Sequence, residues 1–470
     1  MGYPRAEDGR SEQTLDDLLQ HVARLSADFR AGLADRRVGP SPELTADALR
    51  AGLGGPLPRS GQDARRVVDA LAAAADPGLL AMAGPRYFGF VIGGSLPAAL
   101  AADWLVSAWD QNAGLYIHSP AAAVIEEITA GWLLELLGLP ATASVGFTTG
   151  ATMANFTALA AARHALLRRV GWDVEEDGLQ GAPPIRVIVG ADVHASLLLA
   201  LRFVGLGRGR ALRVAVDDEG RMDPAGLADA LAEDDGPTLV AAQLGEVNTG
   251  ALDPIGQIVA AVRRHRHAWL HVDGAFGLWA AASPRRRHLV GGHDGADSWA
   301  TDAHKWLNVP YDAGVVIVRD PAAHRAAMGI GAAYLPPAPG QERDAFEWVP
   351  ELSRRGRGFV VYAALLELGA EGVAALVDRC CDHARRMAER LAADPRVRIA
   401  NEVVLNQVLV EVGDAATTAA VIERVQAEGT AWLGGTTFHG RPAMRISISG
   451  WSTTADDIDR SADAILRALD

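Results

Sequence analysis

The chain has 470 residues, of which 49% are hydrophobic and 22% are charged, as in globular proteins that combine one large domain with smaller ones. Its formal net charge is −14, from 44 basic and 58 acidic residues, which argues against a nucleic-acid partner because such a partner requires a basic surface. The longest apolar run, near Leu96–Leu105, is shorter than the roughly 20 residues of a membrane span, and the polar N-terminus does not read as a secretory signal, so we expect no membrane partner and a cytoplasmic location.

Residues 1–84 predict an N-terminal helical arm. They are polar and interrupted by proline and glycine, with a helix around Leu15–Leu33. A better-marked helix follows the arm: Ser119 caps it, Pro120 occupies its first turn, and a Gly-Leu-Pro sequence ends it. The apolar stripe of this helix consists of Ile125, Ile128, Trp132, Leu133 and Leu136.

Residues 85–358 predict a large α/β domain. Short β-branched runs alternate with helical patterns, and the candidate strands are Arg186–Val189, Leu239–Leu244, Trp269–Asp273 and Gly314–Arg319. Such alternation is typical of a mainly parallel sheet covered by helices. The end of this region, residues 320–358, contains several prolines and little periodicity, which predicts a long loop of the kind that forms a mobile lid.

Residues 359–470 predict a small α+β C-terminal domain. Phe359–Leu391 has a helical pattern, and the candidate strands Gln407–Val412 and Ala443–Ser449 flank a helix over Ala416–Glu428. The two cysteines of the chain, Cys380 and Cys381, are adjacent in the first of these helices. Neighbours in a helix point in different directions, so they predict neither a disulfide nor a metal site.

Lys305 is the single lysine among the 44 basic residues. A GC-rich coding sequence explains why arginine stands elsewhere, and a lysine that persists marks a position where arginine would fail chemically. Arginine stays protonated and cannot act as an amine nucleophile, whereas lysine can. Apolar neighbours between Trp299 and Leu307 would partly desolvate the amine and favour its neutral, nucleophilic form. The alternative is a surface lysine between His304 and Trp306.

A turn rich in small residues, Gly146–Asn155, precedes a predicted helix over Phe156–Arg168. Small residues let the backbone approach an anion, and the free N–H groups at the start of a helix hold phosphate. The turn lacks the Gly-Lys of a Walker loop. Taken alone, a turn of this kind is more often an ordinary helix cap.

Two further polar residues follow predicted strands. Asp273 ends an apolar strand, and ligands of open α/β sheets bind beyond the carboxyl ends of the strands, where an aspartate can pair with a protonated ring nitrogen. His194 lies where a strand leads into a helix, and it could stack on a cofactor ring or transfer a proton. A capping aspartate and a structural histidine are the alternatives.

Together and in this order, the motifs resemble the group II pyridoxal 5′-phosphate (PLP)-dependent amino-acid decarboxylases, a family that includes aromatic-amino-acid, glutamate, tyrosine and diaminobutyrate decarboxylases. The resemblance extends from about Pro85 to the C-terminus. Its most specific stretches are Asp273-Gly274-Ala275, His304-Lys305-Trp306, Tyr87-Phe88-Gly89-Phe90 and the helix that begins at Ser119-Pro120. It implies PLP fold type I, the fold of aspartate aminotransferase, and a homodimer with a shared active site. It also implies decarboxylation of an L-amino acid to an amine and CO₂.

The resemblance implies a role for each matching residue. Lys305 corresponds to the lysine that carries PLP as a Schiff base, and Asp273 corresponds to the carboxylate paired with the pyridine nitrogen. Ala275 would pack under the cofactor ring, and His194 would stack over the ring and take part in catalysis. No metal is implied.

The same resemblance places further residues around the phosphate and the lid. The phosphate contacts would be Ala151, Thr152 and His304. Tyr334 corresponds to the tyrosine of the mobile loop, which protonates the carbanion, and Arg354 corresponds to the arginine of that loop. The chain departs from many relatives at Val247, which has no hydroxyl to contact a substrate, and at Met153, where a polar residue is common.

The substrate is less closely defined than the cofactor. The apolar residues Phe88, Phe90 and Ile92 favour an aromatic or bulky aliphatic amino acid, with Arg354 as a further contact, unless they only pack the core. The alternatives on the same fold are a PLP-dependent aldehyde synthase or an aminotransferase. A scaffold that no longer catalyses is disfavoured by the complete set of Lys305, Asp273 and His194.

Overall fold

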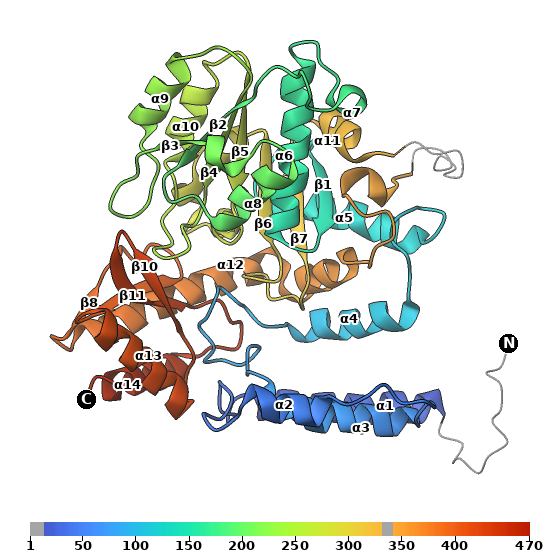
Figure 1. Cartoon of the computed structure of the whole chain (residues 1–470), viewed down its shortest axis with the longest axis vertical. Helices are drawn as coiled ribbons and strands as arrows, with labels where there is room; N and C mark the ends of the chain where they lie inside the picture. Colours follow the sequence, from blue (N-terminus) through green and yellow to red (C-terminus); the bar gives the residue numbers. More distant parts are fainter. Residues whose placement is uncertain (1–13, 331–341) are drawn as a thin grey trace.

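The computed structural model describes residues 14–330 and 342–470, which contain two β-sheets (Figure 1). The larger sheet has seven strands in the order β1-β7-β6-β5-β4-β2-β3. Strands β2 to β6 are parallel, whereas β7 runs antiparallel to its neighbours β6 and β1. The prediction of a mainly parallel sheet is therefore confirmed. The strands are Ser144–Thr148 (β1), Arg186–Gly190 (β2), Leu212–Val214 (β3), Thr238–Gln243 (β4), Ala268–Asp273 (β5), Ser298–Asp302 (β6) and Gly314–Val318 (β7).

Alternate residues of these strands face two separate hydrophobic cores, because successive side chains of a strand point to opposite faces. In β2, Val187 and Val189 pack with α6, α8 and α11, whereas Ile188 packs on the face covered by α5, α9, α10 and α12. Helix α6 lies across β5, β6 and β7 and directs its N-terminus towards the carboxyl edge of the sheet. The helices of this region are Pro97–Trp109 (α4), Pro120–Leu136 (α5), Ala151–Arg168 (α6), Val174–Asp177 (α7), Ala195–Phe203 (α8), Pro224–Ala232 (α9), Ile255–Val262 (α10) and Pro321–Met328 (α11).

The smaller sheet is antiparallel and belongs to the C-terminal region (Figure 1). Its order is β10-β11-β9-β8, and α13, α14 and the end of α12 cover it. The α+β prediction for this region is confirmed. The elements are Gly358–Ala392 (α12), Val397–Ile399 (β8), Gln407–Val412 (β9), Ala415–Glu428 (α13), Gly434–Phe438 (β10), Arg441–Ser447 (β11) and Ala455–Arg467 (α14).

Helix α12 joins the two cores. Its first half packs with the large sheet and its end packs with the small sheet, with a kink at Gly369, where φ is +61°. By length and composition alone, α12 is apolar enough to cross a membrane, a test that core helices of soluble proteins also pass. Cys380 and Cys381 lie in it, both buried and both free thiols.

The N-terminal arm contains three helices, Leu15–Gly32 (α1), Ala46–Leu53 (α2) and Ala64–Ala75 (α3). They form a layer of their own below α4 (Figure 1). The predicted helix over Leu15–Leu33 is confirmed as α1, which Thr14 caps. The predicted domain boundaries at residues 84 and 358 stay predictions.

Two local predictions need correction. The segment 320–358 is not one continuous loop, because Asp320 caps α11 and Pro321 takes its first turn. The helix predicted from Phe156 begins at Ala151, five residues earlier, since Gly150 serves as its N-cap. The apolar stripe of α5 does face the cores: Leu133 is fully covered, and Ile125, Trp132 and Leu136 are partly covered, whereas Ile128 is 40% exposed.

Candidate active site

Four chain segments meet at the carboxyl edge of the large sheet. Strand β5 ends at Asp273, and the turn after β6 carries Lys305. The loop after β2 carries His194, and the N-terminus of α6 begins at Ala151. Asp302, the last residue of β6, contacts two of these segments: its Oδ1 accepts a hydrogen bond from the Ala151 N–H (2.5 Å), and its Oδ2 lies 3.0 Å from Lys305 Nζ. The structure therefore brings together the residues that the motifs singled out.

The N-terminus of α6 has the features of an anion site. Its N-cap, Gly150, has no side chain, and within the described chain no acceptor reaches the backbone N–H groups of Thr152 and Met153. The imidazole of His304 lies beside it, since a Cβ placed on Gly150 would stand 3.1 Å from His304 Cε1. Gly314 packs so closely against Gly150 that a Cβ there would stand 2.4 Å from the Gly150 Cα. Free N–H groups at a helix start suit a phosphate.

Lys305 lies in a partly enclosed position. Its side chain is 19% exposed, and its neighbours Ala303 and Trp306 are buried. The ring of His304 contacts Tyr311, with 4.4 Å between the ring centroids. His304 Nδ1 accepts the Ala313 N–H, which leaves the proton of a neutral imidazole on Nε2, 3.5 Å from Asp302 Oδ1.

Asp273 is held by a chain of buried hydrogen bonds. Asn155 Nδ2 donates to Asp273 Oδ2 (3.0 Å), and the Ala275 N–H donates to Asp273 Oδ1 (3.2 Å). The Oδ1 of Asn155 lies 2.9 Å from His271 Nε2, and on the other side of that ring His271 Nδ1 lies 2.9 Å from Ser298 Oγ.

This network admits one proton arrangement. Burial lowers the pKa of His271 to about 4, against the opposing effect of Asp273, so the ring is neutral at physiological pH. Asn155 Nδ2 donates to Asp273, so its Oδ1 accepts from His271 Nε2. The neutral ring then accepts at Nδ1 from Ser298 Oγ, which itself accepts from Trp269 Nε1 (2.9 Å). Every donor of this chain therefore points towards the Asp273 carboxylate and fixes its orientation.

His194 caps α8 and faces the same edge. Its Nδ1 accepts the Ser196 N–H, so a neutral ring carries its proton on Nε2. The surrounding protein lowers the pKa of His194 by desolvation, Asp273 acts in the opposite direction, and Lys305 and Arg445 lower it further. His194 is therefore a neutral hydrogen-bond donor at physiological pH.

Arg445 of β11 is a site residue that the sequence reasoning missed. Its guanidinium is half-buried and makes no hydrogen bond or ion pair with any described residue, yet its charge acts on His194. Desolvation lowers the pKa of Arg445, and Glu246 opposes this effect. A half-buried cation without a partner is a suitable contact for an anionic ligand group. Asn155, His271, Asp302 and Tyr311 were also not predicted.

The apolar residues predicted as substrate contacts stay predictions, and in the single chain they lie in different surroundings. Phe88 belongs to the core of the small domain, and Phe90 is 62% exposed and stacks on Trp432. Ile92 packs with the N-terminal arm. The glycines that follow serve the lysine turn instead, since a Cβ on Gly93 would stand 2.0 Å from the Lys305 carbonyl oxygen.

The remaining predicted residues fall in three places. Arg354 is not a substrate contact: its Nη1 lies 2.7 Å from Glu126 Oε1, and it donates to the carbonyls of Ala113 and Phe147. This buried ion pair ties the segment before α12 to α5. Val247 packs against the larger core. Tyr334 lies outside the described residues.

The residues present fit PLP. Lys305 offers an amine for the aldehyde, the start of α6 with His304 offers an anion site, and Asp273 offers a fixed carboxylate for the ring nitrogen. No group of three or more metal-binding side chains occurs in the described part of the chain.

Comparisons with known proteins support this assignment. A family model described as "Pyridoxal-dependent decarboxylase conserved domain" matches residues 49–412. An aromatic-L-amino-acid decarboxylase of Bacillus atrophaeus is 30% identical over 361 residues, which are 75% of this chain and 72% of the relative. An L-2,4-diaminobutyrate decarboxylase of Rhizobium meliloti is 29% identical over 381 residues, 78% of this chain and 74% of the relative.

The fold is that of solved PLP enzymes. The crystal structure of Oryza sativa TDC with PLP and tryptamine superposes with a TM-score of 0.90 at 22% identity, over 98% of this chain and 99% of that one. Mouse CSAD superposes with a TM-score of 0.89 at 22% identity, over the same shares. The prediction of fold type I is confirmed.

Proposed function

Since the chain belongs to the pyridoxal-dependent decarboxylase family and is therefore a carboxy-lyase that acts on an amino acid, we propose that Lys305 is the residue that binds PLP covalently. The observation that carries this proposal is the contact of the only lysine of the chain with Asp302 (3.0 Å), the residue that also accepts the Ala151 N–H at the start of α6. When bound, PLP withdraws electrons from the Cα of the amino acid, which lets the bond to the carboxylate break.

The phosphate and the ring have separate binding groups in this proposal. The N–H groups of Ala151 and Thr152 and the Nε2–H of His304 hold the phosphate. Asp273 would pair with the protonated ring nitrogen, and the Asn155–His271 chain keeps its carboxylate in place. Ala275 packs under the ring, where its N–H already bonds Asp273.

The substrate carboxylate has a candidate partner in Arg445. The charge of its guanidinium acts on the imidazole of His194. Together the two side chains can orient the substrate carboxylate relative to the PLP ring. His194 in its neutral form donates a hydrogen bond without adding a second positive charge that would hold back the departing CO₂. The two residues thus set which bond of the substrate is broken.

We place aromatic or bulky apolar amino acids first among the substrates. The relative at 30% identity is named for aromatic amino acids. Tyr87 and Phe90, which both stack on Trp432, lie a few residues before Gly93, whose backbone packs against the Lys305 carbonyl. Decarboxylation to the amine is favoured over the aldehyde synthase and aminotransferase alternatives, because the matching family is named for decarboxylation. We also place the enzyme in the cytoplasm.

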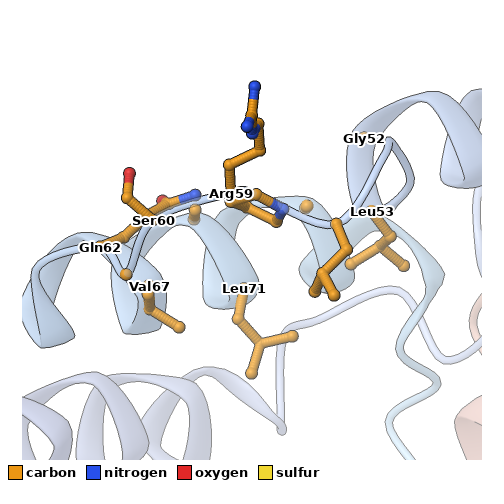
Figure 2. Close-up of a pocket in the computed structure, with 12 residues that line it drawn as sticks. Gly52, Leu53, Arg59, Ser60, Gln62, Val67 and Leu71 are labelled. Carbon is orange, nitrogen blue, oxygen red and sulfur yellow. The ribbon is translucent and has the colours of Figure 1, made fainter.

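A homodimer would cover apolar surface that one chain leaves open. No residue of α1, α2 or α3 is buried within the described chain. A groove of about 510 Å³ runs between α2 and α3, and Figure 2 shows Leu53, Val67 and Leu71 at it. The large exposed apolar residues of the described part of the arm are Leu15, Leu19, Leu53, Leu57, Val67, Leu71, Leu79 and Met82. A second copy of the chain is the simplest partner for such amphipathic helices.

The function is tested by incubating the purified enzyme with each of the L-amino acids and measuring CO₂, amine and aldehyde. We expect CO₂ and amine in equal amounts from an aromatic amino acid, and less from glutamate. CO₂ with aldehyde as the main product, or a keto acid without CO₂, would favour the alternatives.

A further inference from the structure

The anion site at the start of α6 contains a carboxylate, which is unusual because two negative groups repel each other there. Asp302 has a side chain that is 4% exposed. Its Oδ1 accepts the Ala151 N–H (2.5 Å), the same donor that the phosphate of the cofactor requires. Its Oδ2 lies 3.0 Å from Lys305 Nζ.

We propose that Asp302 is a positioning residue that controls cofactor loading: it occupies the helix start in place of a phosphate and holds the amine of Lys305 in an ion pair until the cofactor displaces it. This inference rests on the proposed role of Lys305 and extends it to a residue outside the predicted set. A carboxylate at a helix start is stabilised by the helix dipole, and a protonated amine beside it is stabilised by the ion pair.

One side chain, Asp302, both occupies the helix start and holds the amine of Lys305. The two oxygens of Asp302 point to different partners, so the helix start and the lysine are held at a fixed separation. His304 Nε2, at 3.5 Å from Oδ1, gives the carboxylate a third neighbour. His304 can donate to Asp302 or to an incoming phosphate, which allows the exchange of one anion for the other.

Two consequences follow for the protein without cofactor. The amine of Lys305 is engaged by the Asp302 carboxylate and must leave this contact before it can attack an aldehyde. Free phosphate binds less tightly than it would without Asp302, because the negative carboxylate at the helix start repels it. The Asp302→Asn variant keeps the shape of the side chain and removes its charge, so it should weaken both the contact with the amine and the repulsion of phosphate.

The presence of a single lysine makes the first effect measurable at one site. Full-length protein freed of cofactor is treated with the neutral reagent 2,4-dinitrofluorobenzene, and the modification of Lys305 is followed by peptide mass spectrometry. Asp302→Asn should raise the labelling rate by about tenfold, as is typical when a partly buried amine loses one close counter-ion. Inorganic phosphate, measured by calorimetry on the same samples, should bind several-fold more tightly to this variant.

The matched control is Asp312→Asn, which removes the same charge from the segment between β6 and β7, where Asp312 pairs with Arg357 (2.8 Å) rather than with Lys305. It should leave the labelling rate of Lys305 unchanged. Asp302→Ser serves as a second variant if Asp302→Asn is unstable, and the same changes are expected. An unchanged labelling rate of Lys305, or weaker phosphate binding, would overturn the proposal.

These measurements do not depend on catalysis. If Lys305 never attaches the cofactor, the proposed function fails while the effect of Asp302 on the amine remains measurable.

Discussion

Replacing Asp273 with asparagine should slow decarboxylation without emptying the cofactor site. Asp273 is 5% exposed and receives hydrogen bonds from Asn155 (3.0 Å) and the Ala275 N–H (3.2 Å). The variant keeps the size of the side chain but removes the negative charge that would face the ring nitrogen. Lys305 and the phosphate contacts are unchanged, so PLP should still bind.

The expected fall in turnover follows from the free-energy cost of leaving the ring nitrogen's charge unpaired in a buried position. Breaking a buried ion pair by removing one partner costs about 3–5 kcal/mol. Each 1.36 kcal/mol added to the barrier slows a reaction tenfold, so turnover should fall roughly 10²–10⁴-fold. Part of this cost is avoided if the ring nitrogen loses its proton. The neutral ring is then a weaker electron-withdrawing group, so the rate still falls.

The assay is the rate of CO₂ release divided by the amount of bound PLP, which is measured after alkaline release. Asp297→Asn is the matched control, since Asp297 is also 5% exposed but lies at the opposite end of β6, where it bonds the Leu270 N–H and Arg263. The control should lose stability and keep its turnover per bound cofactor. A turnover of Asp273→Asn close to that of the native enzyme would refute the role of Asp273.

Three further outcomes are expected. Arg445→Gln should raise the KM for the amino acid about tenfold or more, because one charge-assisted contact is lost. Its PLP content should be unchanged, and a native KM would remove Arg445 from the site. Tyr334→Phe should retain CO₂ release but shift the product from amine towards aldehyde with O₂ uptake, and unchanged amine production would assign the proton to another group, with His194 the next candidate. Light scattering should report a dimer for the native chain and a larger monomer fraction for Leu57→Arg, because Leu57 is 93% exposed in the single chain; a fully active native monomer would contradict the shared site.

The features that could be predicted from the sequence are local ones. Lys305, Asp273 and His194 each follow a strand within a few residues, so a strand pattern and a motif suffice to place them at one sheet edge. The strands β2, β4, β5 and β7 were recognisable because they are buried runs of apolar and β-branched residues. Strands β1 and β6 were not, since Ser144–Thr148 and Ser298–Asp302 mix small and polar residues with few β-branched ones.

The features that were missed depend on contacts between distant segments. Arg445 is 140 positions from Lys305 in the sequence, and only the packing of the small domain brings its charge near His194. Arg354 was assigned to the substrate from its place in a motif, whereas Glu126 of α5 is its partner. The stack of Phe90 on Trp432 likewise joins segments more than 300 residues apart. Local patterns carry no information about such pairings.

The central claim is that the single lysine of this chain carries the cofactor. Reduction of the purified enzyme with borohydride, followed by peptide mass mapping, tests it most directly. We expect the visible absorption band of the bound cofactor to disappear and the mass of reduced pyridoxal phosphate to be found on Lys305. Recovery of free pyridoxal phosphate after reduction, with Lys305 unmodified, would contradict it.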